Sequence, residues 1–319
     1  FGIRDYTLIG TSWRREQGPA DPLLRKMLAE RGLDNVPQWT KKDDVRTAAS
    51  EYWLSRGKDR DGPVNPDKRE ITDTLHITEE VKAKALELGA NLVGCCALTP
   101  TMIDEGFDMP HRNVFAFILA EDYGNVLKGS LAIEAETYEV YMRIADIATD
   151  LATFIRDMGY PAWAHHNGAL QIQAIPTMYQ CGLGELGRHG SLINPTYAAN
   201  FRPGFVTTNL PVLYDSPLEF GVQDYCRNCK ICRNNCPGDA IATDHIVTEG
   251  IKRWRIDMEK CYPFSRLHDA YCHICVDVCP YVHKENGDTE KRTMYGAYMK
   301  RRKQDGYRSP NRLRYEEED

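Results

Sequence analysis

Blocks of apolar residues alternate with polar stretches through the first half of the chain. After Thr78 come two glutamates, and the amphipathic stretch that they open ends at Gly89, which predicts a helix between these two residues. The apolar runs 91–98 and 113–121 are short and are bounded by polar residues. Runs of this length predict buried strands.

A longer periodic segment follows. Over 130–158 the apolar residues recur at helical spacing, and the segment stops at Gly159, two residues before a proline, so we expect one long helix. Residues 160–224 are rich in Gly and Pro, which predicts loops. The two predicted strands and two predicted helices together indicate an α/β (or α+β) core with helices packed on a sheet.

Composition divides the rest of the chain. The segment 1–75 is rich in charge, Pro and Gly, and we expect an irregular wrapping segment with a few short helices. The core is expected over 76–224 and a cysteine-rich module over 225–283, followed by a charged tail over 284–319.

The overall charge narrows the classes of function. The chain has 319 residues, a formal net charge of -6 and an isoelectric point near 5.9, which argues against nucleic acid as a partner. It contains no apolar run long enough to span a membrane. We expect a soluble protein in the cytoplasm, or an exported, membrane-associated form if a leader has been removed.

Eight of the eleven cysteines lie between residues 226 and 279. Disulfide scaffolds are typically short secreted chains, so metal ligation is favoured here. In bacterial two-cluster ferredoxins, three closely spaced thiolates bind one 4Fe-4S cluster, and a fourth, followed by proline, binds the neighbouring cluster. This chain matches that run at every position with Cys226, Cys229, Cys232, Cys236 and Pro237.

A second run contains Cys272, Cys275 and Cys279, again followed by proline. A regular copy would have a cysteine at 269, where the chain has Asp269, and Cys261 is the upstream replacement. One cluster would then be held by Cys226, Cys229, Cys232 and Cys279, and the other by Cys261, Cys272, Cys275 and Cys236. A pair of zinc sites is the alternative, because paired Cys-x-x-Cys also binds zinc.

The blocks "GYPAWAHHNG" and "CGLGELGRHGSLINPTYAANFRPGFVTTNLPV", followed by the two cysteine runs, resemble the catalytic subunit of reductive dehalogenases over roughly residues 80–283. The resemblance implies a nitroreductase-like core that holds a base-off corrinoid (cobalamin) beside a bacterial-type two-cluster ferredoxin module. It also implies that electrons from an external low-potential donor pass through two 4Fe-4S clusters and that halide is removed from a small organohalide.

The same resemblance assigns site residues. Glycine permits close approach of the backbone to a large planar cofactor, and Arg188 would bind the cofactor or have a structural role. The cofactor-binding set is Gly182, Gly184, Gly187 and Arg188. A tyrosine is expected to donate the proton, and Tyr141 fits better than Tyr138, with a cation and a polar residue beside it. The catalytic set is Tyr141, Asn167 and Arg202.

Two other functions are compatible with these residues. An epoxyqueuosine-reductase-like enzyme of tRNA maturation would share the cofactors, but the acidic charge offers no broad basic surface for phosphates. An electron carrier without catalytic activity would need only the cluster module, and the size of the region before it argues against this alternative.

Overall fold

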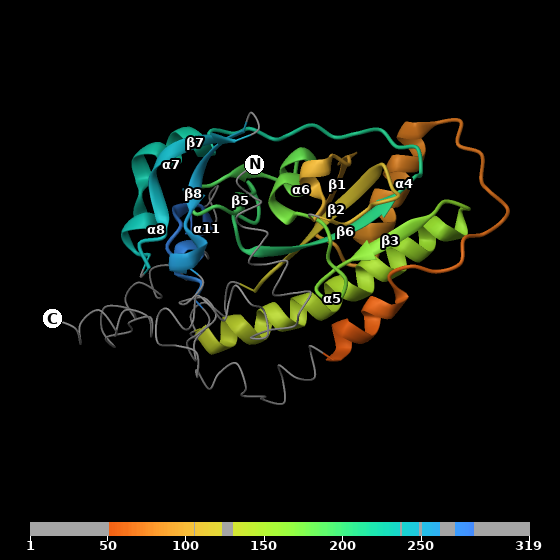
Figure 1. Cartoon of the computed structure of the whole chain (residues 1–319), viewed down its shortest axis with the longest axis horizontal. Helices are drawn as coiled ribbons and strands as arrows, with labels where there is room; N and C mark the ends of the chain where they lie inside the picture. Colours follow the sequence, from red (N-terminus) through yellow and green to blue (C-terminus); the bar gives the residue numbers. More distant parts are fainter. Residues whose placement is uncertain are drawn as a thin grey trace.

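The computed structural model shows two regions at opposite ends of the molecule, a sheet covered by helices and a group of short cysteine-bearing helices (Figure 1). The residues described are 51–104, 106–122, 130–236, 238–248, 251–261 and 272–283. Most of the predicted N-terminal segment and the whole predicted tail lie outside these ranges. In the described part of the chain, none of the helices combines the length and apolar character needed to cross a bilayer.

The core contains a four-stranded sheet in the order β1-β2-β6-β3. The strands are β1 (Leu92–Ala97), β2 (Asn113–Ala120), β3 (Ala162–His165) and β6 (Phe201–Thr208). All three pairs are antiparallel, so the core is of the α+β type. The two predicted strands are confirmed as β1 and β2.

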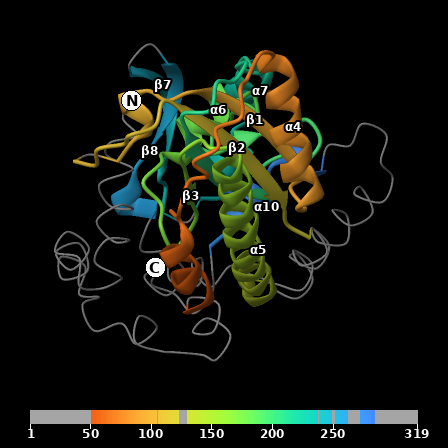
Figure 2. The ribbon, with the colours of Figure 1, turned by 90° about the vertical axis from the view of Figure 1, so that its right-hand side faces the viewer.

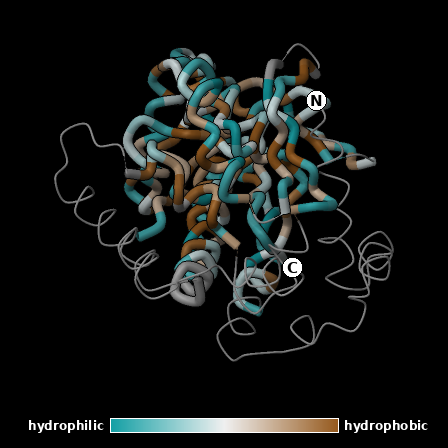
Figure 3. Tube along the Cα trace, turned by 90° about the vertical axis from the view of Figure 1, so that its left-hand side faces the viewer, coloured by the Kyte–Doolittle hydropathy of each residue, from teal (hydrophilic) through white to brown (hydrophobic). Residues whose placement is uncertain are grey.

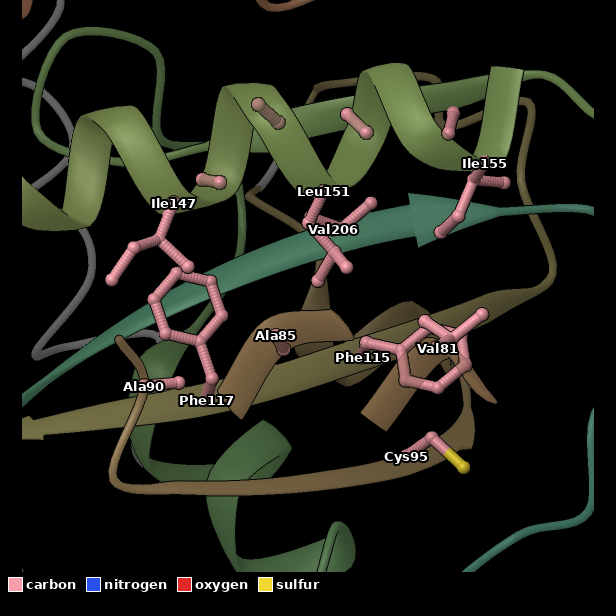
Figure 4. Packing of buried hydrophobic residues seen from close by; sticks show 14 of the residues in the cluster. Val81, Ala85, Ala90, Cys95, Phe115, Phe117, Ile147, Leu151, Ile155 and Val206 are labelled. Atoms are coloured by element: carbon pink, nitrogen blue, oxygen red, sulfur yellow. The ribbon is translucent and has the colours of Figure 1, made fainter. Parts of the chain in front are cut away.

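β2 is buried on both faces of the sheet, which explains its continuous apolar sequence. Because successive side chains point to opposite faces, Phe115 and Phe117 pack in one apolar cluster and Val114 and Ala116 in the other. Helices α4 (Thr74–Glu87) and α5 (Ser130–Asp157) cover the first face, and α6 (Ala174–Gln180) covers the second. Figure 4 shows the two phenylalanines between the helices of the first face.

The start of α4 differs from the prediction. The helix begins at Thr74, and the side chain of Asp73 caps it by accepting hydrogen bonds from the backbone N–H groups of Leu75 and His76, at 2.9 and 3.0 Å. Thr78 lies inside the helix, where its hydroxyl donates to the carbonyl of Thr74 at 2.6 Å. Both residue types can cap a helix, and Asp73, five residues before Thr78, takes the role.

α5 spans 28 residues and confirms the predicted long helix. It lies next to α4 on the same side of the sheet (Figure 2). Gly159, two residues after its end, has a φ of 84°, a left-handed conformation that glycine adopts without strain. Along the trace, many hydrophobic stretches lie toward the middle of the described part of the chain, and hydrophilic ones are common toward its outside (Figure 3).

The prediction of loops over 160–224 is wrong for β3, α6 and β6, and for the short strands β4 (Glu185–Leu186) and β5 (Leu192–Ile193). β6 was missed because it contains Pro203 and Gly204, which are rare inside strands. Pro203 is tolerated because β3 pairs only with residues 205–208, so β6 has a single neighbour at this position. A side chain at Gly204 would collide with the ring of Phe117.

The cysteine module consists of short helices and one hairpin. Its elements are α7 (Val222–Cys229), α8 (Ile231–Asn234), β7 (Ile241–Thr248), β8 (Ile251–Ile256), α10 (Ile274–Asp277) and α11 (Pro280–His283). Lys230 separates α7 from α8 in a left-handed conformation, with a φ of 53°. This turn lets two consecutive helices present cysteines to the same space.

Candidate functional site

Four cysteines of the module line one pocket. Cys226 and Cys229 come from α7, Cys232 comes from α8, and Cys279 directly precedes α11. The other lining residues are Arg188, His189, Tyr225, Lys230, Pro280 and Tyr281. The structure therefore brings together the four thiols that the sequence assigns to one cluster.

The other four cysteines pack against a second apolar cluster, which has buried Cys232 as one of its members. They are Cys236, Cys261, Cys272 and Cys275, with buried Ile241 and Ile256 from the hairpin. No disulfide joins any of the eleven cysteines, all of which lie in the described ranges. Over those same ranges, no three Cys, His, Asp or Glu side chains converge closely enough to hold a single metal ion.

Burial makes these thiols reluctant to ionise. It raises the pKa of Cys232 and of Cys279 to about 12, with neighbouring thiols of the same pocket adding to the effect. For Cys275, burial and then the nearby Cys272 and Cys261 raise the pKa well above its ordinary value. Thiolates are the metal-binding form, so ionising two groups of four requires a strongly positive partner at each. Soft sulfur donors in groups of four suit iron–sulfur clusters.

A second polar site lies where α5 passes the ends of β2 and β6. The guanidinium of Arg202 lies 5.9 Å from the ring centroid of Tyr141, so the structure brings together the predicted acid and the predicted cation. The Nε of Arg202 donates to Oε1 of Glu121 at 2.8 Å. The antiparallel register pairs Arg202 with Leu119 and thereby places Glu121 beside it.

Glu121 is a functional candidate that the sequence prediction missed. Its side chain is only 4% exposed, and Oε1 also accepts a hydrogen bond from the hydroxyl of Thr137 at 2.7 Å. Burial alone would raise the pKa of this carboxyl, but Arg202, His273 and Thr137 together lower it. His273 lies between Cys272 and Cys275 in sequence and 3.4 Å from Arg202, so this polar group extends to the cluster module.

Trp53 is a second residue that the sequence did not indicate. Its ring lies 5.2 Å from that of Tyr138 and 5.9 Å from that of Tyr141, and its own exposure is 8%. Its backbone carbonyl also contacts Gly168 so closely that a side chain there would collide. Trp53 therefore packs between α5 and the turn after β3.

Asn167 lies in that turn and is half-buried. The preceding residue, His166, is buried and accepts a hydrogen bond at Nδ1 from the N–H of Gly168 at 3.1 Å. Burial lowers the pKa of His166 to about 4, so its ring is neutral at physiological pH. Asn167 directly precedes Gly168, which contacts the Trp53 carbonyl, and the catalytic role of Asn167 remains a prediction.

The predicted cofactor-binding glycines are packed against the chain itself. A side chain at Gly182, which has a φ of 70°, would meet the carbonyl of Ser216, and one at Gly184 would meet that of Ile193. A side chain at Gly187 would meet the ring of His189. Internal packing therefore explains the need for glycine at these positions, and their role toward a cofactor stays a prediction.

Arg188 is 1% exposed, and its guanidinium donates hydrogen bonds to backbone carbonyls of the cysteine module. These contacts match the structural alternative that the sequence left open.

Comparison with known proteins shows what the chain is similar to. A family model for the 4Fe-4S dicluster domain matches residues 225–282. The tetrachloroethene reductive dehalogenase of Sulfurospirillum multivorans is 28% identical over 279 residues, which cover 73% of this chain and 54% of that protein. The resemblance to reductive dehalogenases and the prediction of an iron–sulfur module are thereby confirmed.

Solved structures agree with this similarity. A catabolic reductive dehalogenase, NpRdhA, in complex with 3-bromo-4-hydroxybenzoic acid, superposes with a TM-score of 0.74 at 24% identity, covering 94% of this chain and 44% of that one. A reductive dehalogenase whose structure suggests a mechanism for B12-dependent dehalogenation gives 0.68 at 26% identity, with coverages of 84% and 40%. An epoxyqueuosine reductase of Cyclobacterium marinum is 29% identical over 127 residues. The chain spans about half the length of the relatives that it matches.

Proposed function

We propose that this chain is a cobalamin-dependent reductive dehalogenase that removes halide from an organohalide, with electrons delivered through two 4Fe-4S clusters. The observation that carries the proposal is the placement of two groups of four thiols beside an α+β core with a tyrosine–arginine pair. The similarity to reductive dehalogenases over 73% of the chain supports it.

The ligands of the clusters are part of the proposal. One cluster is bound by Cys226, Cys229, Cys232 and Cys279, and the other by Cys236, Cys261, Cys272 and Cys275. The pocket supports this division because it is lined by the first set alone, and the second set packs against one apolar cluster, which Cys232 of the first set also joins. Cys232 and Cys275 are close enough for the buried thiol of one to affect the other, so the two groups are neighbours. Adjacent clusters form a path for single electrons.

The corrinoid is supported by the similarity to a B12-dependent relative rather than by the residues predicted to hold it. The chain itself packs against the three glycines, and Arg188 is engaged with backbone carbonyls, so a contact of these four residues with the corrinoid stays a proposal. When bound, a base-off corrinoid would supply the metal centre at which the carbon–halogen bond is reduced. The core around it would be nitroreductase-like, with domain limits at 76–224 and 225–283.

The residues around Tyr141 account for the proton. Replacement of halogen by hydrogen consumes two electrons and one proton and releases a halide ion, and Tyr141 donates that proton from its hydroxyl. Arg202 stabilises the negative charge left on the phenolate, and Glu121 holds the guanidinium in place. Tyr141 is favoured over Tyr138 because the Arg202 guanidinium lies over the Tyr141 ring. Asn167 would orient the substrate.

The proposal is tested by halide release under anaerobic conditions, with a reduced low-potential dye as donor and tetrachloroethene or 3-bromo-4-hydroxybenzoic acid as the probe. We expect Tyr141→Phe to lower the rate by about 100-fold or more, because it removes a general acid. Tyr138→Phe, a matched change one turn away on α5, is expected to leave the rate within about threefold of that of the unmodified protein.

The contradicting result is also specific. Absence of halide release from either probe, together with reduction of an epoxyqueuosine-containing tRNA stem-loop, would replace this function with that of the epoxyqueuosine reductases.

A further inference from the structure

The short segment 185–188, "ELGR", reaches from the core into the cysteine module. Its first two residues form β4, which pairs with β5, so the segment belongs to the core by its backbone. Its two charged side chains, from Glu185 and Arg188, are 5% and 1% exposed. Both make their hydrogen bonds to the module, on and around the helix α7 that bears Cys226 and Cys229.

Glu185 binds the beginning of α7. Its Oε2 accepts hydrogen bonds from the N–H groups of Phe220 at 2.7 Å and of Val222 at 3.0 Å. Its Oε1 accepts from the N–H of Gln223 at 2.9 Å. The residue at the cap position is Gly221, which has no side chain to satisfy these donors, so a carboxylate from another element replaces the usual capping residue. Its negative charge also complements the helix dipole.

Arg188 binds the other end of the same helix. Its Nε donates to the carbonyl of Cys226 at 3.0 Å, and one terminal nitrogen donates to that of Arg227 at 3.2 Å. The second terminal nitrogen donates to the carbonyls of Ala242 and Thr243 in β7, at 3.1 and 2.9 Å. The guanidinium also lies 4.5 Å from the ring of Trp254, so a buried cation is held from several sides.

We propose that Glu185 and Arg188 are positioning residues for the cluster bound in the pocket of Cys226, Cys229, Cys232 and Cys279, and that the buried charge of Arg188 raises the reduction potential of that cluster. Arg188 lines the pocket, whereas Glu185 does not. Reduction adds one negative charge to the cluster, and a nearby buried cation stabilises the reduced form most. The inference rests on the part of the proposed function that assigns a 4Fe-4S cluster to these thiols.

The test uses the full chain, reconstituted anaerobically with iron and sulfide, and follows the reduced cluster by electron paramagnetic resonance during a redox titration. At the midpoint potential of the unmodified protein, we expect Arg188→Gln to lower the ratio of reduced to oxidised cluster by about tenfold, equivalent to a downward shift of about 59 mV for one electron. Arg227→Gln is the matched control, because that side chain is on the same helix but is 57% exposed. Its ratio should change by less than about twofold.

A second readout separates position from charge. Arg188→Lys keeps the charge but cannot reach four carbonyls, and Glu185→Gln keeps the shape but loses the charge that complements the helix. We expect both to release iron to a chelator several-fold faster than the unmodified protein and Arg227→Gln. This measurement stands even if Arg188→Gln does not fold.

Unchanged potential in Arg188→Gln, or iron release from the other two variants at the unmodified rate, would overturn the inference while leaving the proposed function intact. Failure of the unmodified chain to bind any 4Fe-4S cluster would instead overturn both.

Discussion

The core and the cysteine module are held together by different means. The core combines a 28-residue helix with a fully buried central strand, and its largest apolar cluster is made of aliphatic and aromatic side chains. In the module, α8, α10 and α11 have four residues each, and the apolar clusters contain cysteines as major members. Helices this short are not stable alone. The core is therefore stabilised by its own packing, and we expect the module to depend on what its thiols bind.

Removing one cluster ligand should have the largest effect, and this effect should be confined to the module. We expect Cys232→Ser to lose about half of the bound iron and to increase hydrogen exchange over α7, α8 and the hairpin, because metal binding and folding are coupled in such modules. Cys95→Ser is the matched control, a buried cysteine of β1 whose Sγ donates to the carbonyl of Leu213 at 3.0 Å. It should retain its iron. Equal iron loss in the two variants would show that the module is not specifically dependent on its thiols.

A cavity created in the core should have the opposite effect: the core is destabilised and the bound iron is retained. Leu151 on α5 is fully buried, and we expect Leu151→Ala to lower the free energy of unfolding of the core by about 2–5 kcal/mol, with unchanged iron content. Glu139→Ala, at an exposed position of the same helix, should change it by less than about 0.5 kcal/mol. Denaturant unfolding of the reconstituted protein measures both. Loss of iron in Leu151→Ala at native conditions would mean that the two regions unfold together.

The smallest effect is expected from pH. Burial lowers the pKa of His111 to about 4; nearby Asp61 opposes this shift, and Arg60 adds a smaller decrease. An unfolded histidine titrates near 6.5. The unfolded chain therefore binds more protons between these values, and the stability that neutral His111 contributes is present above pH 6.5 and lost as pH falls to about 4. We expect His111→Gln to make the acid-induced loss of core stability shallower, by on the order of 1–3 kcal/mol.

Thermal unfolding followed between pH 7 and pH 4 measures this difference. His76→Gln is the control, because the side chain of His76 is 72% exposed. The same slope in both variants would show that buried His111 does not govern the acid sensitivity of the core.

The sequence alone was sufficient to predict those features whose signal lies within a single segment. The cysteine spacing, the apolar run of β2 and the periodicity of α5 each lie within one segment, and the structure has these elements where the sequence predicts them. β6 was missed because Pro203 and Gly204 weaken a strand signal, and their tolerance depends on pairing with β2 and β3, which no single segment reveals.

The site depends on distant partners in the same way. Glu121 meets Arg202 through strand register, and Trp53 reaches Tyr141 from a segment whose sequence indicates no fixed structure. The segment 185–188 looks like part of a glycine-rich cofactor loop in sequence, but its charged residues hold α7. In sequence the segment offers two charged residues, each directly after a glycine, and their hydrogen-bond partners could not be predicted without the fold.

The most direct test of the central claim is the content of iron, acid-labile sulfide and cobalt per chain after anaerobic reconstitution with cobalamin. The account predicts about eight iron atoms, about eight sulfides and one cobalt, as two 4Fe-4S clusters and one corrinoid require. Two zinc ions without sulfide, or eight iron atoms without cobalt, would contradict it, the first for the cluster module and the second for the dehalogenase.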